Sequence, residues 1–428
     1  MKVWKTVLAA ALAVLSVGVA QAEPQKISVW HAMEPAHRAV FESFVTRFNR
    51  EQNDVQVEVS HAPSFEAMQS GLTQALANKQ PPHFVQLPDN HAPELVARQN
   101  QILPLHQLLA KYPVRDLKWF LPQTTSFVRD SKGRLLALPL MAEVPVLYYN
   151  RDLYAKAGLD PNQPPRTWRD LQAQLLALQA AGSVCPYATS RMAWVHQENL
   201  AAVNNKPFAS RNNGLDGGNA QLMVKDGLHV RHMALMSSWA RSKLFVLATV
   251  DDTADRAFAN GECAVLSAGT GAWAQLANAR FSSGVAPLPI YAEATKAPAV
   301  PLVGGSSLWA TSGHPAAEQK AMASFVAWLA SPAVAAEWHQ RTGFLPLTEA
   351  AWRAADVSFY NSIPGAQQVV QTLQQPPGQF SRGVRLPGYP AVLQILNEET
   401  WAALTGAKPA MQAQNDAAAR AAVALKGK

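Results

Sequence analysis

One segment of the chain, residues 145–172, constrains the fold more than any other. Its sequence is PVLYYNRDLYAKAGLDPNQPPRTWRDLQ. The apolar run at its start predicts a buried strand, Asn150 is a residue type preferred at a helix N-cap, and Gly158 is typical of a helix end. After a proline-rich turn, Thr167 and Asp170 have the spacing of a capping box at the start of an amphipathic helix. The segment therefore predicts a compact module of one strand and two capped helices.

The part of the chain before residue 90 alternates between strand-like and helix-like patterns. Apolar side chains predict strands at residues 27–30, 55–59 and 84–87, and their spacing predicts helices at residues 41–48 and 71–77. This βαβαβ order predicts a parallel sheet with helices on both faces, so the fold class is α/β. Ligands of such sheets bind beyond the carboxyl ends of the strands. Phe65 and Asp89 lie just beyond two predicted strands and are therefore candidate ligand contacts.

The N-terminus has the pattern of a secretory signal peptide. Two lysines in the first five residues precede a short apolar run at residues 7–20, and a small-x-small cleavage site ends at Ala22. We expect the mature chain to begin at Glu23, without a lipid anchor, because no cysteine follows the apolar run. No later stretch stays apolar for the roughly 20 residues that a membrane helix needs, so we expect a soluble, periplasmic protein.

The length of the mature chain predicts two lobes. Cleavage after residue 22 leaves 406 of the 428 residues, which is more than one hydrophobic core usually supports. The predicted division is 1–22 for the signal peptide, 23–136 and 304–348 for lobe 1, and 137–303 and 349–428 for lobe 2. The net charge of +7 comes from scattered basic residues without a run, which argues against nucleic acid as a partner.

The chain has two cysteines, Cys185 and Cys263. In an exported protein the default expectation is a disulfide between them, and the alternative is a pair of buried free thiols. We expect no metal site and no cofactor, because there is no CxxC motif and the histidines are dispersed. His229 and His232 have the spacing i, i+3 in a predicted helix but lack a third ligand nearby in the sequence.

Several segments together resemble one protein family. They are residues 145–172, the stretch FVAWLASPAVAAEWHQRTGFLPLTEAAW at residues 325–352, and two short pieces at residues 29–31 and 383–386. These segments are similar to the extracellular solute-binding proteins of ABC importers that are related to maltose-binding protein, and most similar to members that bind glycerol-3-phosphate. The resemblance implies a type II, maltose-binding-like fold with hinge crossings and a ligand cleft between two lobes. It also implies a monomer that delivers a small-molecule ligand to inner-membrane ABC permease subunits.

The resemblance also implies a set of ligand contacts. The glycerol-3-phosphate-binding members use two tyrosines, a carboxylate, two serines, a glycine, an arginine and two tryptophans. The matching positions here are Phe65, Asp89, Glu143, Arg191, Trp194, Gly269, Gly305, Phe344 and a position near Leu393. Both tyrosines are therefore phenylalanines, Glu143 and Gly269 replace the serines, and Arg191 replaces one tryptophan. The arginine is replaced by a leucine, so the cation that binds phosphate in the family is missing at its usual position.

These departures change what the pocket can bind. Glu143 repels a phosphate group, and each lost charge-assisted hydrogen bond removes about 1.5–3 kcal/mol. Arg191, Arg385 or the backbone N–H groups at Gly269 and Thr270 are candidates to replace the missing cation. Otherwise Glu143 beside Trp194 would suit a quaternary ammonium, as in glycerophosphocholine. A neutral sugar, stacked on Trp194 and hydrogen-bonded to Asp89 and Glu143, is the alternative ligand.

Each candidate residue also has a purely structural interpretation. The two phenylalanines can be core residues, and Asp89 can cap a turn. Glu143 can pair with Arg191 without touching a ligand, Arg385 can form an interlobe salt bridge, and residues 304–305 can serve only the hinge backbone. Trp194 is the candidate that we most expect to face the ligand.

The function predicted from the sequence is capture and delivery of a small solute, not catalysis. The rival hypothesis is a secreted hydrolase in which Asp89 and Glu143 form an acid–base pair. The sequence has no nucleophile elbow, no metal cluster and no recognisable motif around these two acids, which argues against an enzyme.

Overall fold

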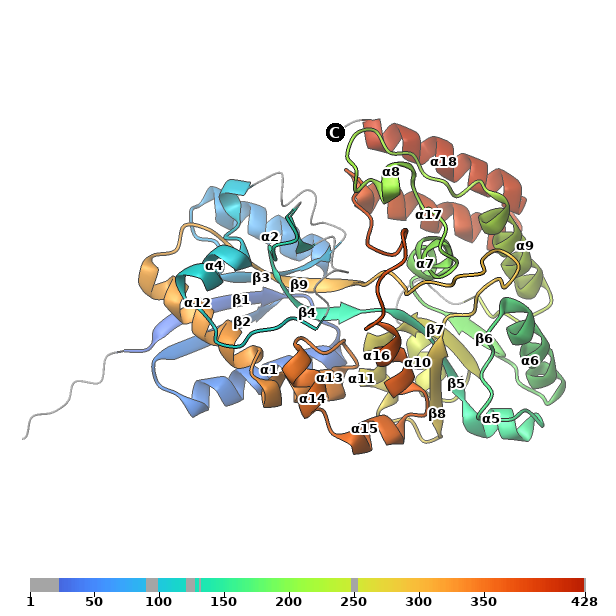
Figure 1. The fold of residues 1–428 in the computed structure, drawn as a ribbon, viewed down its shortest axis with the longest axis horizontal. Coiled ribbons are helices and arrows are strands. Elements are labelled where there is room, and N and C mark those ends of the chain that lie inside the picture. The colour runs from blue at the N-terminus through green and yellow to red at the C-terminus, as the bar shows by residue number, and fades with distance from the viewer. Residues whose placement is uncertain (1–22, 90–98, 121–127, 131, 248–252, 427–428) are drawn as a thin grey trace, which may run out of the picture.

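A computed structural model describes residues 23–89, 99–120, 128–130, 132–247 and 253–426 of the chain (Figure 1). The predicted signal peptide lies outside the described residues. Two β-sheets, each flanked by helices, stand side by side and correspond to the two predicted lobes. None of the described helices is both long and apolar enough to cross a membrane.

The first lobe contains a five-stranded sheet with the order β2–β1–β3–β9–β4. Its strands are β1 (Gln25–His31), β2 (Val55–His61), β3 (Phe84–Pro88), β4 (Leu138–Glu143) and β9 (Gly304–Ala310). Strands β1, β2 and β3 are parallel, as the βαβαβ pattern predicts, whereas β9 runs antiparallel to its neighbours β3 and β4. The helices beside this sheet are α1 (Pro35–Glu51), α2 (Phe65–Ala77), α4 (Leu105–Lys111), α12 (Ala316–Leu329) and α13 (Pro332–Thr342).

Helix α1 shows why the aromatic spacing of this region predicts a helix on a core. Its residues Phe41, Phe44 and Phe48 are buried on one face. They meet Trp328 and Trp338 edge to face, with ring centroids 5.4–6.2 Å apart. Such contacts between large rings contribute both buried area and favourable geometry, and they fix α1 against α12 and α13.

The second lobe contains a four-stranded sheet with the order β6–β7–β5–β8. Its strands are β5 (Pro145–Asn150), β6 (Tyr187–Thr189), β7 (Val265–Gly269) and β8 (Ser283–Pro287). The remaining helices are α5 (Arg151–Lys156), α6 (Trp168–Ala180), α7 (Asn199–Val203), α8 (Ser210–Asn213), α9 (Gly227–Arg241), α10 (Thr253–Ala259), α11 (Trp273–Leu276), α14 (Glu349–Ala354), α15 (Val357–Ser362), α16 (Ala366–Thr372), α17 (Tyr389–Leu404) and α18 (Ala410–Lys426).

The module predicted at residues 145–172 forms as expected. The Asn150 side chain accepts hydrogen bonds from the backbone N–H groups of Asp152 and Leu153 and so caps α5. Thr167 and Asp170 form the capping box of α6, in which each side chain accepts from the other residue's backbone. Gly158, just after α5, has a φ of +72°, which glycine adopts without strain.

The sequence predicts the first crossing between the lobes within residues 135–145, with the lobe boundary drawn at residue 137. Strand β4 pairs with β9 in the first sheet, and only β5 joins the second sheet, so the crossing lies at Val144. Burial does not mark this position, because the run from residue 138 to 149, Glu143 included, is buried throughout. The chain is back in the first sheet at β9, which begins at the predicted residue 304. The full division into lobes stays a prediction.

The predicted disulfide between Cys185 and Cys263 is present. It ties the residues before β6 to those before β7 across a sequence separation of 78 residues. His229 and His232 have hydrogen-bond partners within the protein. The His229 ring is within hydrogen-bond distance of Asp226 and of the Gln197 carbonyl, and the His232 ring contacts His196 and Tyr291.

We expect the double variant Cys185→Ala/Cys263→Ala to be less stable by about 4 kcal/mol, because closing a loop of this length removes that much chain entropy from the unfolded state. The measurement is urea unfolding followed by tryptophan fluorescence, and wild-type protein reduced with dithiothreitol is the control. An unchanged unfolding midpoint in both samples would contradict a stabilising role for the disulfide.

Candidate ligand-binding site

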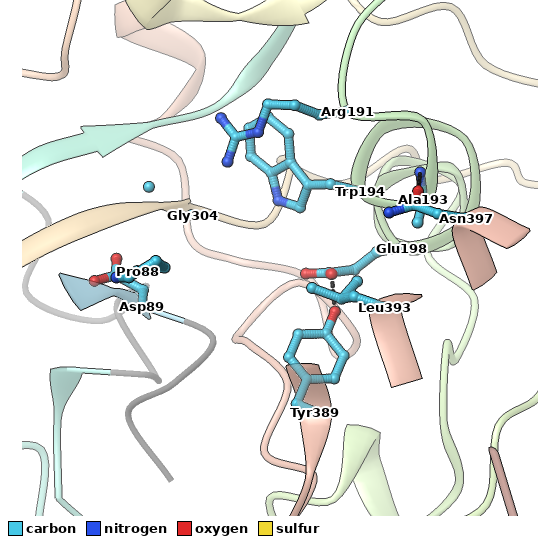
Figure 2. A pocket seen from close by; sticks show the side chains of 11 residues that line it. Pro88, Asp89, Arg191, Ala193, Trp194, Glu198, Gly304, Tyr389, Leu393 and Asn397 are labelled. Atoms are coloured by element: carbon cyan, nitrogen blue, oxygen red, sulfur yellow. Dashed lines mark hydrogen bonds between the residues drawn. The ribbon is translucent and has the colours of Figure 1, made fainter. Parts of the chain in front are cut away.

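Two adjoining pockets lie where the lobes meet. We call the first the Trp194 pocket. It has a volume of about 210 Å³, and its lining includes Asp89, Trp194, Glu198, Tyr389, Leu393 and Asn397 (Figure 2). We call the second the Phe344 pocket. It has a volume of about 240 Å³, and its lining includes His37, Phe65, Gln86, Glu143, Ser306 and Phe344. Pro88, Arg191 and Gly305 line both pockets.

Arg191 stands at the junction of the two pockets. It follows β6 and precedes a π-helical turn, Trp194–Glu198, and its backbone has a φ of +53°, a left-handed conformation that costs a non-glycine residue free energy. Its guanidinium carbon lies 4.1 Å from the centre of the Trp194 ring, a cation–π contact (Figure 2). The side chain is 38% exposed, so it can still reach a ligand. Among the described residues that line the two pockets, it is the one arginine or lysine.

Glu143 at the end of β4 is held by the protein itself. Its carboxylate is buried, forms an ion pair with Arg191, and accepts a hydrogen bond from the Gly271 backbone N–H at 3.2 Å. The proposed structural pairing of Glu143 with Arg191 is therefore present. A Cβ atom on Gly269 would lie 2.0 Å from Glu143 Oε2, so a larger residue at this position would force the carboxylate to shift. Glu143 and Gly269, which stand at the positions of the two family serines, therefore depend on each other for space.

Two backbone amides of the candidate anion site at residues 269–271 already donate hydrogen bonds within the protein. The Thr270 N–H donates to the Val144 carbonyl at 2.9 Å, and the Gly271 N–H donates to Glu143. Both amides are therefore occupied by the protein. Thr270 lines a separate cavity of about 40 Å³ beside Tyr148, whereas Gly269 and Gly271 line the Phe344 pocket. The predicted helix after Gly271 is only a short turn, α11, which presents no extended N-terminus.

Asp89 follows β3 and is buried in the wall of the Trp194 pocket. It accepts a hydrogen bond from the Ser307 hydroxyl at 2.7 Å. Burial raises the pKa of Asp89 to about 7, and the nearby Glu143 carboxylate adds to the rise, while Ser307 and Arg191 oppose it. The carboxyl group is therefore only partly ionised near neutral pH.

The two phenylalanines that replace family tyrosines both line the Phe344 pocket. Phe65 begins α2, and Phe344 follows α13. Phe344 stacks on His37 with ring centroids 4.5 Å apart, and His37 is within hydrogen-bond distance of the Gly271 carbonyl at 2.9 Å. This group joins α1 of the first lobe to the turn after β7 of the second.

Arg385 does not line either pocket. Its guanidinium donates to the Arg129 carbonyl at 3.1 Å, and its backbone N–H donates to the Asn213 carbonyl at 2.9 Å. These contacts agree with the interlobe interpretation of Arg385, although the acceptor is a carbonyl and not a carboxylate. Of the candidate arginines among the described residues, Arg191 is the one that lines the pockets.

Three polar residues of the Trp194 pocket were not predicted: Glu198, Tyr389 and Asn397. The Tyr389 hydroxyl donates to the buried Glu198 carboxylate (Figure 2), and burial raises the pKa of Glu198 to about 7. Asn397 Oδ1 accepts from the Ala193 N–H at 3.1 Å. Tyr389 and Asn397 are four residues before and after Leu393 on α17, so the helical period could have found them from the position of the missing arginine.

Comparison with known proteins places the chain in a family. Residues 34–336 match the family of bacterial extracellular solute-binding proteins. The sn-glycerol-3-phosphate-binding periplasmic protein UgpB of Escherichia coli K12 is 36% identical over 420 residues, which cover 97% of this chain and 95% of that protein. The protein of the same name from Yersinia pseudotuberculosis is 35% identical over 406 residues, which cover 94% of this chain and 92% of that protein.

Solved structures show the same fold. The crystal structure of UgpB from Mycobacterium tuberculosis in complex with glycerophosphocholine superposes with a TM-score of 0.75, at 21% identity, and covers 95% of this chain and 99% of that one. Maltose-bound MalE3 of T. maritima superposes with a TM-score of 0.73, at 20% identity, and covers 92% of this chain and 98% of that one. The fold is therefore the two-lobed, maltose-binding-like fold, as predicted.

Proposed function

The chain belongs to the family of bacterial extracellular solute-binding proteins, and from this we propose that it is the substrate-binding component of an ABC importer for sn-glycerol-3-phosphate or a glycerophosphodiester such as glycerophosphocholine. The ligand lies in the two pockets between the lobes, and Arg191 at their junction binds its phosphate group. The position of Arg191 is the observation that carries this proposal. It places a cation at the junction of the pockets, whereas the position of the family arginine is occupied here by Leu393.

The charges around the pockets favour a diester over a monoester. The acids Glu34, Asp89, Glu143, Glu198 and Asp255 line the two pockets. A phosphate monoester carries up to two negative charges near neutral pH. A phosphodiester carries one, and a choline ester also brings a positive group. Glycerophosphocholine therefore meets less repulsion than glycerol-3-phosphate in this acid-rich cleft.

Calorimetric titration of the mature protein with each ligand tests the proposal. We expect micromolar or tighter dissociation constants, tighter for glycerophosphocholine, and compaction on binding measured by small-angle scattering as the lobes close. If the protein binds neither compound but binds maltose, a neutral sugar becomes the proposed ligand. Recovery of the unchanged ligand after long incubation separates a binding protein from the rival hydrolase.

The remaining parts of the proposal concern the cellular setting. We propose export to the periplasm with cleavage after Ala22, a monomeric state, and delivery to inner-membrane permease subunits. UgpB relatives carry the word periplasmic in their names, and this supports the location. Intact mass of the secreted protein, with Glu23 as the first residue, checks the cleavage, and light scattering checks the monomer.

A further inference from the structure

The Trp194 pocket contains a buried acid that phosphate binding does not explain. Glu198 ends the π-helical turn, and its carboxylate points into the space below Trp194 (Figure 2). The charged or titratable groups that act on it are the Tyr389 hydroxyl from α17 and Arg191 from the same segment as Glu198. Asp89 closes the opposite wall. Burying a carboxyl group in a ligand pocket costs free energy unless a partner compensates for the lost water.

Arg191 compensates the charge of Glu198 only in part. It already forms an ion pair with Glu143 and lies over the Trp194 ring. The hydrogen bond from Tyr389 satisfies one carboxylate oxygen but leaves the charge uncompensated. A pocket of about 210 Å³ with a tyrosine, a tryptophan and a buried carboxyl in its wall has the chemistry of a site for an organic cation.

We propose that the Trp194 pocket is a subsite for the cationic head group of a zwitterionic glycerophosphodiester, with Glu198 as its counter-charge. This inference rests on the proposed function and extends it: the phosphate lies at Arg191, the glycerol lies in the Phe344 pocket, and the head group lies beside Glu198 and Tyr389. The assignment differs from the sequence-based expectation, which placed the ammonium at Glu143. Glu143 is excluded because Arg191 and the Gly271 amide already hold it.

The pH dependence of binding follows from the buried acid. Burial raises the pKa of Glu198 to about 7, so the carboxyl group of the empty pocket is partly protonated at neutral pH. A bound cation favours the ionised form, so binding releases protons and tightens as the pH rises through 7. Glycerophosphocholine itself keeps fixed charges between about pH 5.5 and about pH 8.5, because it has neither a second phosphate ionisation nor a titratable amine. Asp89, whose pKa is also about 7, adds to the slope.

The central experiment compares two ligands on one variant. Glu198→Gln keeps an oxygen that accepts from Tyr389 but removes the charge. We expect its affinity for glycerophosphocholine to fall about 30-fold, whereas its affinity for glycerol-3-phosphate rises about threefold, because a negative charge near the phosphate is lost. Glu398→Gln makes the same change on the outer side of α17, where Glu398 pairs with Arg420, and should leave both affinities unchanged.

The pH series gives an independent readout. For wild type we expect tighter glycerophosphocholine binding at about pH 8 than at about pH 6, and proton release measured by titration in two buffers of different ionisation enthalpy. The slope should be smaller in Glu198→Gln, and Asp89→Asn should remove what remains. If Glu198→Gln does not fold, Tyr389→Phe replaces it: loss of the hydroxyl raises the pKa of Glu198, so the binding curve should move to higher pH.

The outcomes separate the two proposals. If wild type binds neither glycerol-3-phosphate nor any glycerophosphodiester, the proposed function is wrong. If wild type binds glycerophosphocholine but Glu198→Gln keeps the same preference between the two ligands and the same pH slope, the function stands and the head-group subsite is overturned. A reversed preference with a reduced slope supports Glu198 as the counter-charge.

Discussion

Replacement of Arg191 by methionine is expected to weaken binding of glycerol-3-phosphate and glycerophosphocholine by at least about 100-fold. The reason is that two charge-assisted hydrogen bonds to phosphate are worth about 1.5–3 kcal/mol each, and every 1.4 kcal/mol is a factor of ten in affinity. The loss is enlarged by Glu143, whose carboxylate is then uncompensated and faces the phosphate. Calorimetric titration of both ligands measures the effect.

Stability must be separated from binding in this variant. Removing one partner of a fully buried ion pair costs about 3–5 kcal/mol, but Arg191 is 38% exposed, so we expect the smaller value of about 2 kcal/mol. The double variant Arg191→Met/Glu143→Gln removes both charges and should recover most of that stability, as measured by urea unfolding. It should not recover phosphate binding. Affinity within threefold of wild type in either variant would show that Arg191 is not the phosphate-binding group.

Much of the fold could be predicted because local signals determined it. The capping residues Asn150 and Thr167 and the aromatic spacing of α1 each follow from patterns within about 20 residues. The three parallel strands follow from the βαβαβ order of the part of the chain before residue 90. The crossing at Val144 could be placed only within residues 135–145, since β4 and β5 form one continuous buried run. Their assignment to different sheets depends on which distant strand each pairs with, β9 or β7.

Single residues of the candidate site could be proposed from the sequence, but the way in which they depend on one another could not. Asp89, Trp194, Gly305 and the two phenylalanines, which the family resemblance names, line the pockets, and their contact with a ligand stays a prediction. The pairing of Glu143 with Arg191 was one of the structural interpretations, but Gly269 was treated as a separate loss. The structure shows that all three depend on one another, because Gly269 makes room for the Glu143 carboxylate and Arg191 compensates its charge. A sequence contains no distance between residues so far apart in the chain, so the part that Gly269 plays had no signal.

The same reason explains Glu198 and Tyr389. They are 191 positions apart in the sequence, and their hydrogen bond forms only because α17 packs beside the π-helical turn. The sequence does carry one hint: a run of polar residues at 196–199 inside an otherwise apolar stretch. Polar side chains that are buried need partners, so such a run indicates a hydrogen-bonded network or a ligand pocket.

Gly305 belongs both to the strand pairing of the first sheet and to the lining of the pockets, so its substitution is expected to have a large effect on stability. It has a φ of +118°, pairs with Ala142 in the β4–β9 ladder, and lines both pockets. A Cβ atom there would lie 2.0 Å from the Met141 carbonyl oxygen, which is backbone and cannot turn aside. We therefore expect Gly305→Ala to destabilise the protein by at least about 4 kcal/mol, through both the unfavourable φ and the clash.

A matched variant separates these two causes. Gly313 also has a positive φ, +94°, but an added Cβ atom would meet nothing within 4 Å. Gly313→Ala should therefore cost only about 1 kcal/mol, the backbone share alone. Urea unfolding of both variants gives the difference, and titration should show weaker ligand binding only for Gly305→Ala, because displacement of β9 moves Ser307 away from Asp89. Equal destabilisation by the two substitutions would mean that the clash is absent, because β4 and β9 can separate at this point. Gly305 would then be needed for the ligand and not for the strand pairing.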